Sequence, residues 1–224
     1  MNCDRIARAY RFLEYAVFGG LLQNCRTTFL AETAGCERAL VLGDGDGRFL
    51  RELTHTSSEL SVDSIDASTA MMRLQRSRML ADGSERVRLH CQPLPSALPG
   101  CGYDLVTTHF FFDCLEEPET AAVIEQAAEV ACANATWLVS EFCVPETFWR
   151  RVRAQVWIET MYAFFRITTG LRVRAVPDYA PLLQKQGFRL CASRTYSAGM
   201  VKAELWKRLP RAKLPIVRGA KNGE

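Results

Sequence analysis

Hydrophobic and polar residues follow two different rhythms along the chain. Between residues 3 and 31, apolar residues recur at helical spacing with charged residues between them, and Gly19-Gly20 divides this stretch into two predicted helices. From residue 39 onward, short unbroken apolar runs replace this pattern. The first run, residues 39–42, ends in glycines, which is typical of a strand buried on both faces of a parallel sheet.

The middle of the chain alternates apolar runs with helical segments. This alternation predicts βαβ units and a doubly wound parallel sheet. A loop rich in proline and glycine, residues 93–100, separates two of the runs. Strands are predicted at residues 39–42, 60–65, 86–90, 103–108 and 136–142, and helices at 49–55, 68–80 (capped by Ser68) and 119–131.

The C-terminal part departs from this alternation. A helical pattern rich in aromatic residues covers 146–169, and a short helix is expected at 177–185. Two further strands, 188–195 and 200–207, are joined through Ser197-Ala198-Gly199 as a hairpin. The predicted fold is therefore α/β, with a doubly wound, mostly parallel, seven-stranded sheet that closes in an antiparallel C-terminal hairpin.

Composition excludes several classes of protein. The 224 residues fit one large domain, and a net charge of +3 does not favour a nucleic-acid partner. None of the nine cysteines forms a C-x-x-C pair, so we expect no metal site. Their spacing also matches no dense disulfide framework, and we therefore expect the protein to work in a reducing compartment. With no apolar signal segment and no membrane span, the predicted location is the cytoplasm. Basic residues gather in 150–174 and 207–221, where the simplest interpretation is solvated surface.

The most informative motif is Gly43-Asp44-Gly45-Asp46-Gly47, directly after the first predicted strand. Ligands of open α/β sheets bind beyond the carboxyl ends of the strands, and glycines let a ligand lie against the main chain. A dinucleotide fingerprint, G-x-G-x-x-G, would need its third glycine where Arg48 stands. Two aspartates in the loop would repel a pyrophosphate and favour a cationic ligand. S-adenosylmethionine, with a sulfonium, an ammonium and no phosphate, meets this requirement.

A carboxylate ends the second predicted strand. Asp66 follows the glycine loop by roughly 20 residues, the interval at which an acid binds ribose in dinucleotide folds. It can accept hydrogen bonds from both hydroxyls of a ribose diol. Asp63 is the alternative, but it lies inside the strand pattern.

These motifs resemble those of the class I (Rossmann-like) S-adenosylmethionine-dependent methyltransferases that act on small molecules. Residues 39–49 are similar to the family's first motif, 64–72 to the second, and 103–109 to the fourth-strand motif. The hairpin at 188–207 resembles the closing antiparallel strands. The resemblance implies S-adenosylmethionine as cofactor and S-adenosylhomocysteine as product.

The resemblance also implies a division of the chain into parts. Residues 1–209 would form a single methyltransferase domain, followed by a flexible basic tail at 210–224. Within the domain, the parts would be a helical lid (1–31), a cofactor-binding core (38–142), a helical substrate-side segment (145–176), and a helix with the C-terminal strand hairpin (177–209).

Cofactor contacts follow from the same resemblance. Asp66 would hold the ribose, Ala67 and a methionine, Met71 or Met72, would lie near the adenine, and Gln92 would bind its amino group. The family often has an acid where Val41 stands, and Asp44 is the candidate to take over its charge. The implied cofactor-binding residues are Gly43, Asp44, Gly45, Asp46, Gly47, Asp66, Ala67, Met71, Gln92, Thr108 and His109, with Tyr10 and Tyr15 from the lid.

The acceptor side has a weaker signature. Methyl transfer is an in-line displacement, and alignment alone can supply about 7–11 kcal/mol, so a dedicated base is not always needed. His109 and Asp113, just past the fourth strand, are the candidate catalytic residues. The alternative is that His109 bonds main chain near the donor and Asp113 caps the next helix.

The aromatic segment 148–165 allows three interpretations. Its broad apolar face can be core, the wall of a pocket for an apolar or aromatic acceptor, or an interfacial helix that touches a membrane surface without inserting. The function that these patterns favour is methyl transfer from S-adenosylmethionine to a small apolar or aromatic acceptor. A non-catalytic S-adenosylmethionine-binding module, acting as sensor or scaffold, is the alternative. Arg48, the loop aspartates and the hairpin disfavour a third candidate, a nicotinamide-dependent oxidoreductase.

Overall fold

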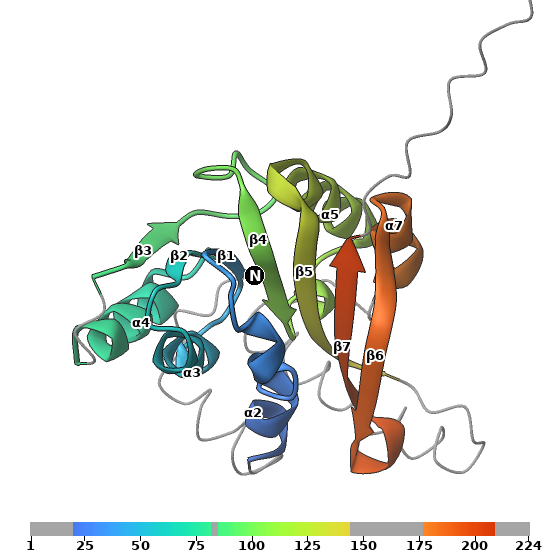
Figure 1. Ribbon diagram of the computed structural model, residues 1–224, viewed down its shortest axis with the longest axis horizontal. Helices are drawn as coiled ribbons and strands as arrows, with labels where there is room; N and C mark the ends of the chain where they lie inside the picture. Colours follow the sequence, from blue (N-terminus) through green and yellow to red (C-terminus); the bar gives the residue numbers. More distant parts are fainter. Residues whose placement is uncertain (1–19, 82–84, 144–176, 209–224) are drawn as a thin grey trace, which may run out of the picture.

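A single sheet of seven strands organises the molecule. The computed structural model describes residues 20–81, 85–143 and 177–208. The strands are β1 (Arg38–Leu42), β2 (Ser61–Asp66), β3 (Val87–Cys91), β4 (Tyr103–His109), β5 (Ala131–Phe142), β6 (Phe188–Tyr196) and β7 (Val201–Arg208). They lie in the order β3-β2-β1-β4-β5-β7-β6 (Figure 1).

Helices cover both faces of the sheet. Of the helices in the described residues, α2, α3 and α4 lie on one face, and α5 and α7 lie on the other (Figure 1). These helices are α2 (Leu21–Arg26), α3 (Arg48–Thr56), α4 (Thr69–Ala81), α5 (Glu117–Val130) and α7 (Tyr179–Lys185), with 3-10 turns η1 (Leu30–Thr33), η2 (Phe112–Cys114) and η3 (Ser197–Gly199).

Strand directions confirm the predicted fold class. Strands β1 to β5 pair in parallel, whereas β7 lies antiparallel between β5 and β6. From β1 the chain builds outward through β2 and β3, and then returns to place β4 on the other side of β1. The order of the strands therefore reverses between β1 and β4, and such a switch point leaves a crevice at the carboxyl ends of the strands.

Strand β1 is buried on both faces, as its unbroken apolar run predicted. Ala39 and Val41 join the core under α3 and α4, which includes Phe49. Leu40 and Leu42 join the core on the α5 side. Each fully buried side chain of this size contributes about 1.5–3 kcal/mol, so β1 is firmly held and its last residue fixes where the glycine turn begins.

The first described helix is shorter than predicted. The helical pattern suggested a helix continuing to about residue 31, but α2 ends at Arg26. The hydroxyls of Thr27 and Thr28 donate to the carbonyl oxygens of Gln23 (3.0 Å) and Asn24 (2.9 Å), which gives the backbone a local alternative to a longer helix. A 3-10 turn, η1, follows instead.

The segment after β4 also corrects one expectation. Helix α5 is capped by Glu116, whose side chain and that of Glu119 form a capping box. The alternative role for Asp113, capping this helix, is therefore wrong, since Asp113 lies one turn earlier in η2. Strand β5 starts at Ala131, but its regular pairing with β4 begins at Thr136, where the strand was predicted to start.

Several predictions fall outside the described residues. These include the lid residues Tyr10 and Tyr15, the aromatic segment 148–165, and the basic tail 210–224. In the ranges that are described, no helix has the length and apolar character needed to cross a bilayer. The same ranges contain no cluster of three or more His, Cys, Asp or Glu residues suited to a metal ion.

Candidate functional site

A cavity of about 290 Å³ lies at the carboxyl ends of β1, β2 and β4, where the strand order reverses. Its volume is close to the lower end of the range for ligand pockets. The lining comes mainly from the turns that follow these strands, 43–46, 66–68 and 109–111. Arg26 of α2 and residues 92–94 after β3 complete much of the wall.

The three glycines of the first turn all adopt positive φ angles, of +68°, +65° and +83° for Gly43, Gly45 and Gly47. A Cβ added at Gly45 would meet no atom within 4 Å, so the main chain there faces open space. At Gly43 a Cβ would collide with the ring of Phe111, and at Gly47 it would press on Gln75. Close approach of a ligand to this turn is therefore available at Gly45. Gly47 is the N-cap of α3 and does not line the cavity.

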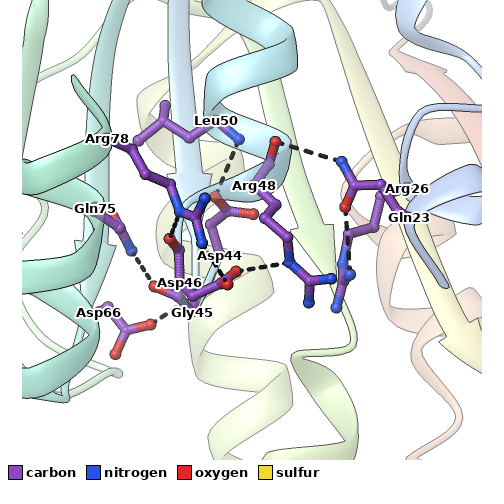
Figure 2. A network of polar contacts seen from close by, with 10 residues as sticks. All are labelled: Gln23, Arg26, Asp44, Gly45, Asp46, Arg48, Leu50, Asp66, Gln75 and Arg78. Carbon is purple, nitrogen blue, oxygen red and sulfur yellow. Dashed lines mark hydrogen bonds and ion pairs between the residues drawn. The ribbon is translucent and has the colours of Figure 1, made fainter. Parts of the chain in front are cut away.

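The two loop aspartates have different environments. Asp44 Oδ2 accepts a hydrogen bond from the Leu50 amide (3.0 Å), and burial raises the pKa of Asp44 to about 7. The carboxylate of Asp46 instead binds the guanidinium groups of Arg48 (3.0 Å) and Arg78 (2.9 Å), as Figure 2 shows. The expectation that both aspartates would repel a phosphate is thus wrong for Asp46, whose charge is offset inside the protein.

Asp66 ties the end of β2 to the glycine turn. Its Oδ2 accepts a hydrogen bond from the Gly45 amide (3.1 Å), and its Oδ1 accepts one from the Ser68 amide (2.8 Å). Asp66 also lines the cavity, so a ligand there lies beside a carboxylate that holds the glycine turn in place.

The alternative carboxylate, Asp63, does not line the cavity. Burial acts to raise its pKa, but hydrogen bonds from Arg88, His90 and Tyr103 outweigh this effect and lower it. Asp63 therefore joins three strands of the sheet, β2, β3 and β4, rather than facing a ligand.

One end of the cavity carries the residues expected near adenine. Ala67, Met71 and Gln92 line it together with Leu94, while Met72 is buried outside the lining. The Gln92 side-chain amide donates to Ser96 Oγ (2.9 Å) and to the Ala97 carbonyl (2.9 Å). Gln92 Oε1 is therefore the atom available to accept a hydrogen bond from a ligand amino group.

His109 lines the opposite end, and its protonation follows from its neighbours. His109 Nδ1 lies 2.9 Å from Ser140 Oγ, and Ser140 Oγ lies 3.3 Å from the Cys25 carbonyl oxygen. When the Ser140 hydrogen points to that carbonyl, Nδ1 is the donor to Ser140 and Nε2 carries the lone pair. Burial and the nearby Arg26 lower the pKa of His109 to about 3. The alternative interpretation, a bond from the His109 side chain to main chain, is not found among the described residues, where its partner is the Ser140 hydroxyl.

Two other predicted residues lie behind the cavity wall. Thr108 Oγ1 accepts a hydrogen bond from the Trp137 indole (3.0 Å). Asp113 is buried in η2, where Cys114 Sγ donates to it (3.3 Å) and burial raises its pKa to about 6. Neither residue lines the cavity.

Sequence reasoning missed Arg26, which is only 7% exposed yet lines the cavity. Its guanidinium lies over the Phe110 ring, 5.0 Å from the centroid, and its Nη1 is 3.5 Å from Gln23 Oε1 (Figure 2). A signal for it was present, because Arg26 shares the helix face of the buried Leu22 and Cys25. Arginine is seldom this buried unless its charge is paired.

Glu141 was also missed. Its Oε1 accepts hydrogen bonds from the amides of Phe111 (2.9 Å) and Phe112 (2.7 Å). These bonds hold the turn after β4, in which Phe110 has a φ of +54° and the ring of Phe111 covers Gly43. Burial, followed by the neighbouring Asp113 carboxylate, raises the pKa of Glu141 well above its usual range.

Comparison with known proteins gives one sequence match and many structural ones. Residues 39–133 match the family described as "Methyltransferase domain". No curated protein sequence matches the chain. Similar solved structures include the mitomycin 7-O-methyltransferase MmcR, with 16% identity, 90% of this chain covered and a TM-score of 0.67. An O-methyltransferase family protein from Burkholderia thailandensis has 14% identity, 92% coverage and a TM-score of 0.72.

A third similar structure is the magnesium protoporphyrin IX methyltransferase of Synechocystis PCC 6803 with bound S-adenosylhomocysteine. It has 17% identity and a TM-score of 0.61, with 84% of this chain and 81% of that chain covered. The chain spans only 57% and 60% of the other two structures. At these identities the likeness establishes the fold.

Proposed function

We propose that this chain, which has the class I methyltransferase fold and carries a methyltransferase domain at residues 39–133, transfers a methyl group from S-adenosylmethionine to a small acceptor. One observation carries the proposal. At the switch point of the sheet, the main chain of Gly45 faces open space, and its amide donates a hydrogen bond to Asp66. This is the arrangement in which a nucleoside can lie against backbone while a carboxylate accepts its ribose hydroxyls. Gln92 and Met71 suit the adenine end.

When bound, S-adenosylmethionine would supply an activated methyl group: a lone pair of the acceptor would bond to the methyl carbon as the carbon–sulfur bond breaks, which leaves S-adenosylhomocysteine, and the proton of an acceptor O–H or N–H would pass to water. The residues of the chain contribute alignment and exclusion of water. Asp66 fixes the ribose, and the turn at 43–47 fixes the main chain against which the donor lies. Phe110 and Phe111 supply apolar wall at the opposite end.

We infer that His109 positions a ligand rather than acting as a general base. With a pKa of about 3, its imidazole stays neutral at physiological pH and is a weak base. Its buried Nε2 has no hydrogen-bond partner among the described residues, so it can accept one from a hydroxyl or amino group of the methyl acceptor. On this proposal, His109→Ala leaves the affinity for S-adenosylhomocysteine within about threefold but slows methyl transfer. Asp113 does not line the cavity, so it can influence a ligand only through the turn after β4 that contains it.

The proposed acceptor is a small aromatic or apolar molecule. Two of the similar structures are named for methylation of mitomycin and of magnesium protoporphyrin IX, both small molecules. The aromatic and aliphatic wall residues Phe110, Phe111 and Leu115 favour the same class here. We further propose that the protein works in the cytoplasm without a nucleic-acid partner. Its eight described cysteines are free thiols, and its net charge is only +3.

Two measurements test the proposal. Calorimetry with S-adenosylmethionine, S-adenosylhomocysteine and NADH should give binding of the first two only; binding of NADH alone would overturn it. Transfer of labelled methyl to a panel of hydroxylated and amino-substituted aromatics should then give turnover. Tight binding without transfer to any acceptor, over a broad panel, would favour the non-catalytic sensor or scaffold.

A further inference from the structure

We infer that Glu141 is a positioning residue for methyl transfer, which holds the turn after β4 in the conformation that forms one wall of the cavity. The kinetic part of this inference rests on the proposed function. Glu141 does not line the cavity, so it acts through the main chain of residues 110–112 and does not touch a ligand.

Two successive residues of β5 hold the turn after β4. The Ser140 carbonyl oxygen accepts a hydrogen bond from the Phe110 amide (2.7 Å). Glu141 Oε1 accepts hydrogen bonds from the next two amides, those of Phe111 (2.9 Å) and Phe112 (2.7 Å). Three consecutive amides of the turn therefore depend on the end of β5, and two of them depend on a side chain that a substitution can remove.

The main chain of this turn has a conformation that needs such support. Phe110 has a φ of +54°, which is uncommon for a bulky residue, whereas Phe111 lies in the right-handed region, with φ −119° and ψ −42°. Left-handed and right-handed residues in succession direct their amides to one place and form a concave site for an anion. The carboxyl oxygen of Glu141 occupies that site, and a strained turn persists where its surroundings fix it in this way.

Two phenylalanines transmit the position of the turn to the cavity. Phe110 and Phe111 line it, and the Phe111 ring lies so close to Gly43 that an added Cβ there would collide with it. A shift of the turn therefore moves the apolar wall relative to the glycine turn. Misplacement of reacting groups by about 1 Å can lower a rate about 100-fold, so a residue that fixes the wall can affect transfer from behind it.

The side chain of Glu141 bonds only to this turn within the described residues. It is fully buried, and Oε2 has no hydrogen-bond partner in the same part of the chain. Lys202 lies opposite Glu141 on β7, but its ammonium group binds the Glu204 carboxylate (2.8 Å). Loss of the Glu141 carboxyl group should therefore act first on the turn.

Three variants test the inference. Glu141→Gln keeps an acceptor oxygen at the same reach, whereas Glu141→Leu has a similar size and no acceptor. Asp63→Leu is the matched control, because it also removes a buried carboxylate that accepts hydrogen bonds, but one that binds side chains of β3 and β4 and not the turn.

The first measurement is hydrogen exchange of the Phe111 and Phe112 amides in the ligand-free protein, which does not depend on the proposed function. We expect both amides to be protected in the wild type and in Glu141→Gln. In Glu141→Leu they should exchange about tenfold faster or more, since two hydrogen bonds are lost. Asp63→Leu should leave their exchange unchanged, whereas a general loss of stability would speed exchange throughout the sheet.

The second measurement is transfer of a labelled methyl group from S-adenosylmethionine. Glu141→Leu should lower kcat/KM for the acceptor about tenfold or more. The affinity for S-adenosylhomocysteine, measured by calorimetry, should stay within about threefold, because the bond between Asp66 and the Gly45 amide remains. Glu141→Gln and Asp63→Leu should keep both quantities within about threefold of the wild type.

Three results would contradict the inference. One is fast exchange of the Phe111 and Phe112 amides in the wild type, a measurement that requires no variant. Another is a Glu141→Leu protein, folded by its thermal transition, that keeps the wild-type exchange or the wild-type kcat/KM. The third is a Glu141→Gln protein that behaves like Glu141→Leu. Failure of the proposed function is distinguishable, because the wild type would then neither bind S-adenosylhomocysteine nor transfer a methyl group, while the differences in exchange would persist.

Discussion

The two ends of the cavity are built in different ways. The end expected to hold ribose and adenine uses residues that follow successive strands, Asp66 after β2 and Gln92 after β3. The other end brings together Arg26 from α2, Asp44 from the glycine turn and His109 from β4. Uncharged hydrogen-bonding groups and one carboxylate characterise the first end, whereas a buried guanidinium, a buried carboxyl group of raised pKa and a neutral imidazole characterise the second. The two ends therefore differ both in charge and in how far apart in the sequence their residues lie.

The largest expected effect comes from closing the space between the two ends. Gly45→Val would place a branched side chain where nothing lies within 4 Å, at a φ of +65°. We expect the affinity for S-adenosylhomocysteine to fall about 100-fold or more, since the ligand loses its contact with main chain. Calorimetry measures this loss.

Gly35→Val is the matched control for this variant. Gly35 has a φ of +85°, also has nothing within 4 Å of an added Cβ, and does not line the cavity. It should lower the melting temperature in the same way without changing the affinity. Equal affinities of the Gly45 variant and the wild type would place the ligand away from this turn.

The difference between the ends also explains what could be predicted from sequence. The strand run 39–42, the glycine turn and Asp66 are local signals, because parallel strands end at one edge of a sheet and the residue after each strand must lie there. The predicted element order and the hairpin followed from the same local patterns. Ser68, predicted to cap α4, accepts a hydrogen bond from the Met71 amide at 3.2 Å.

The end lined by Arg26, Asp44 and His109 depends on contacts between distant segments, which no local pattern encodes. Arg26 reaches the cavity because α2 packs beside α3, and the tautomer of His109 depends on Ser140 of β5 and the Cys25 carbonyl. The ion pair that neutralises the charge of Asp46 likewise depends on a distant residue, Arg78 of α4. In each case the chemistry of a residue is set by a partner far away in the sequence, and for that reason the charge argument failed for Asp46.

The next largest effect tests which carboxylate serves the nucleoside end. Asp66→Ala should weaken S-adenosylhomocysteine binding at least about tenfold, because hydrogen bonds to a charged group contribute about 1.5–3 kcal/mol. Asp63→Ala should leave the affinity unchanged while lowering stability, since Asp63 holds Arg88, His90 and Tyr103 instead. Binding isotherms and thermal melts of the two variants separate these outcomes. The reverse pattern would assign the ribose to Asp63.

A smaller effect, about tenfold, is expected from pH at Asp44, which lines the cavity. The pKa of Asp44 is about 7, and its charged neighbours are Arg26, Asp46 and Asp66. A donor ammonium favours the ionised form, so S-adenosylhomocysteine should bind about tenfold more weakly at pH 6 than at pH 8. His109, with a pKa of about 3, stays neutral over this range. Asp44→Asn should remove the dependence.

The stability of the ligand-free protein should respond to pH in the opposite sense. Between about pH 4 and 7, folded Asp44 keeps a proton that the unfolded chain has released, so this group destabilises the fold increasingly as pH rises. The stability of Asp44→Asn relative to the wild type should therefore increase from pH 5 to pH 8. Chemical denaturation at several pH values measures the difference, and a difference that does not change with pH would contradict the raised pKa.

The smallest effect is expected at the adenine contact. Gln92 donates through its amide nitrogen to Ser96 and Ala97, which leaves Oε1 to accept one neutral hydrogen bond from the adenine amino group. Such a bond contributes about 0.5–1.5 kcal/mol, so Gln92→Leu should weaken S-adenosylhomocysteine binding about two- to tenfold. The inosine analogue, with an oxygen in place of that amino group, separates this contact from a general loosening of the loop. The wild type should discriminate against it and Gln92→Leu should not, whereas equal discrimination by both proteins would move recognition of the amino group to another residue.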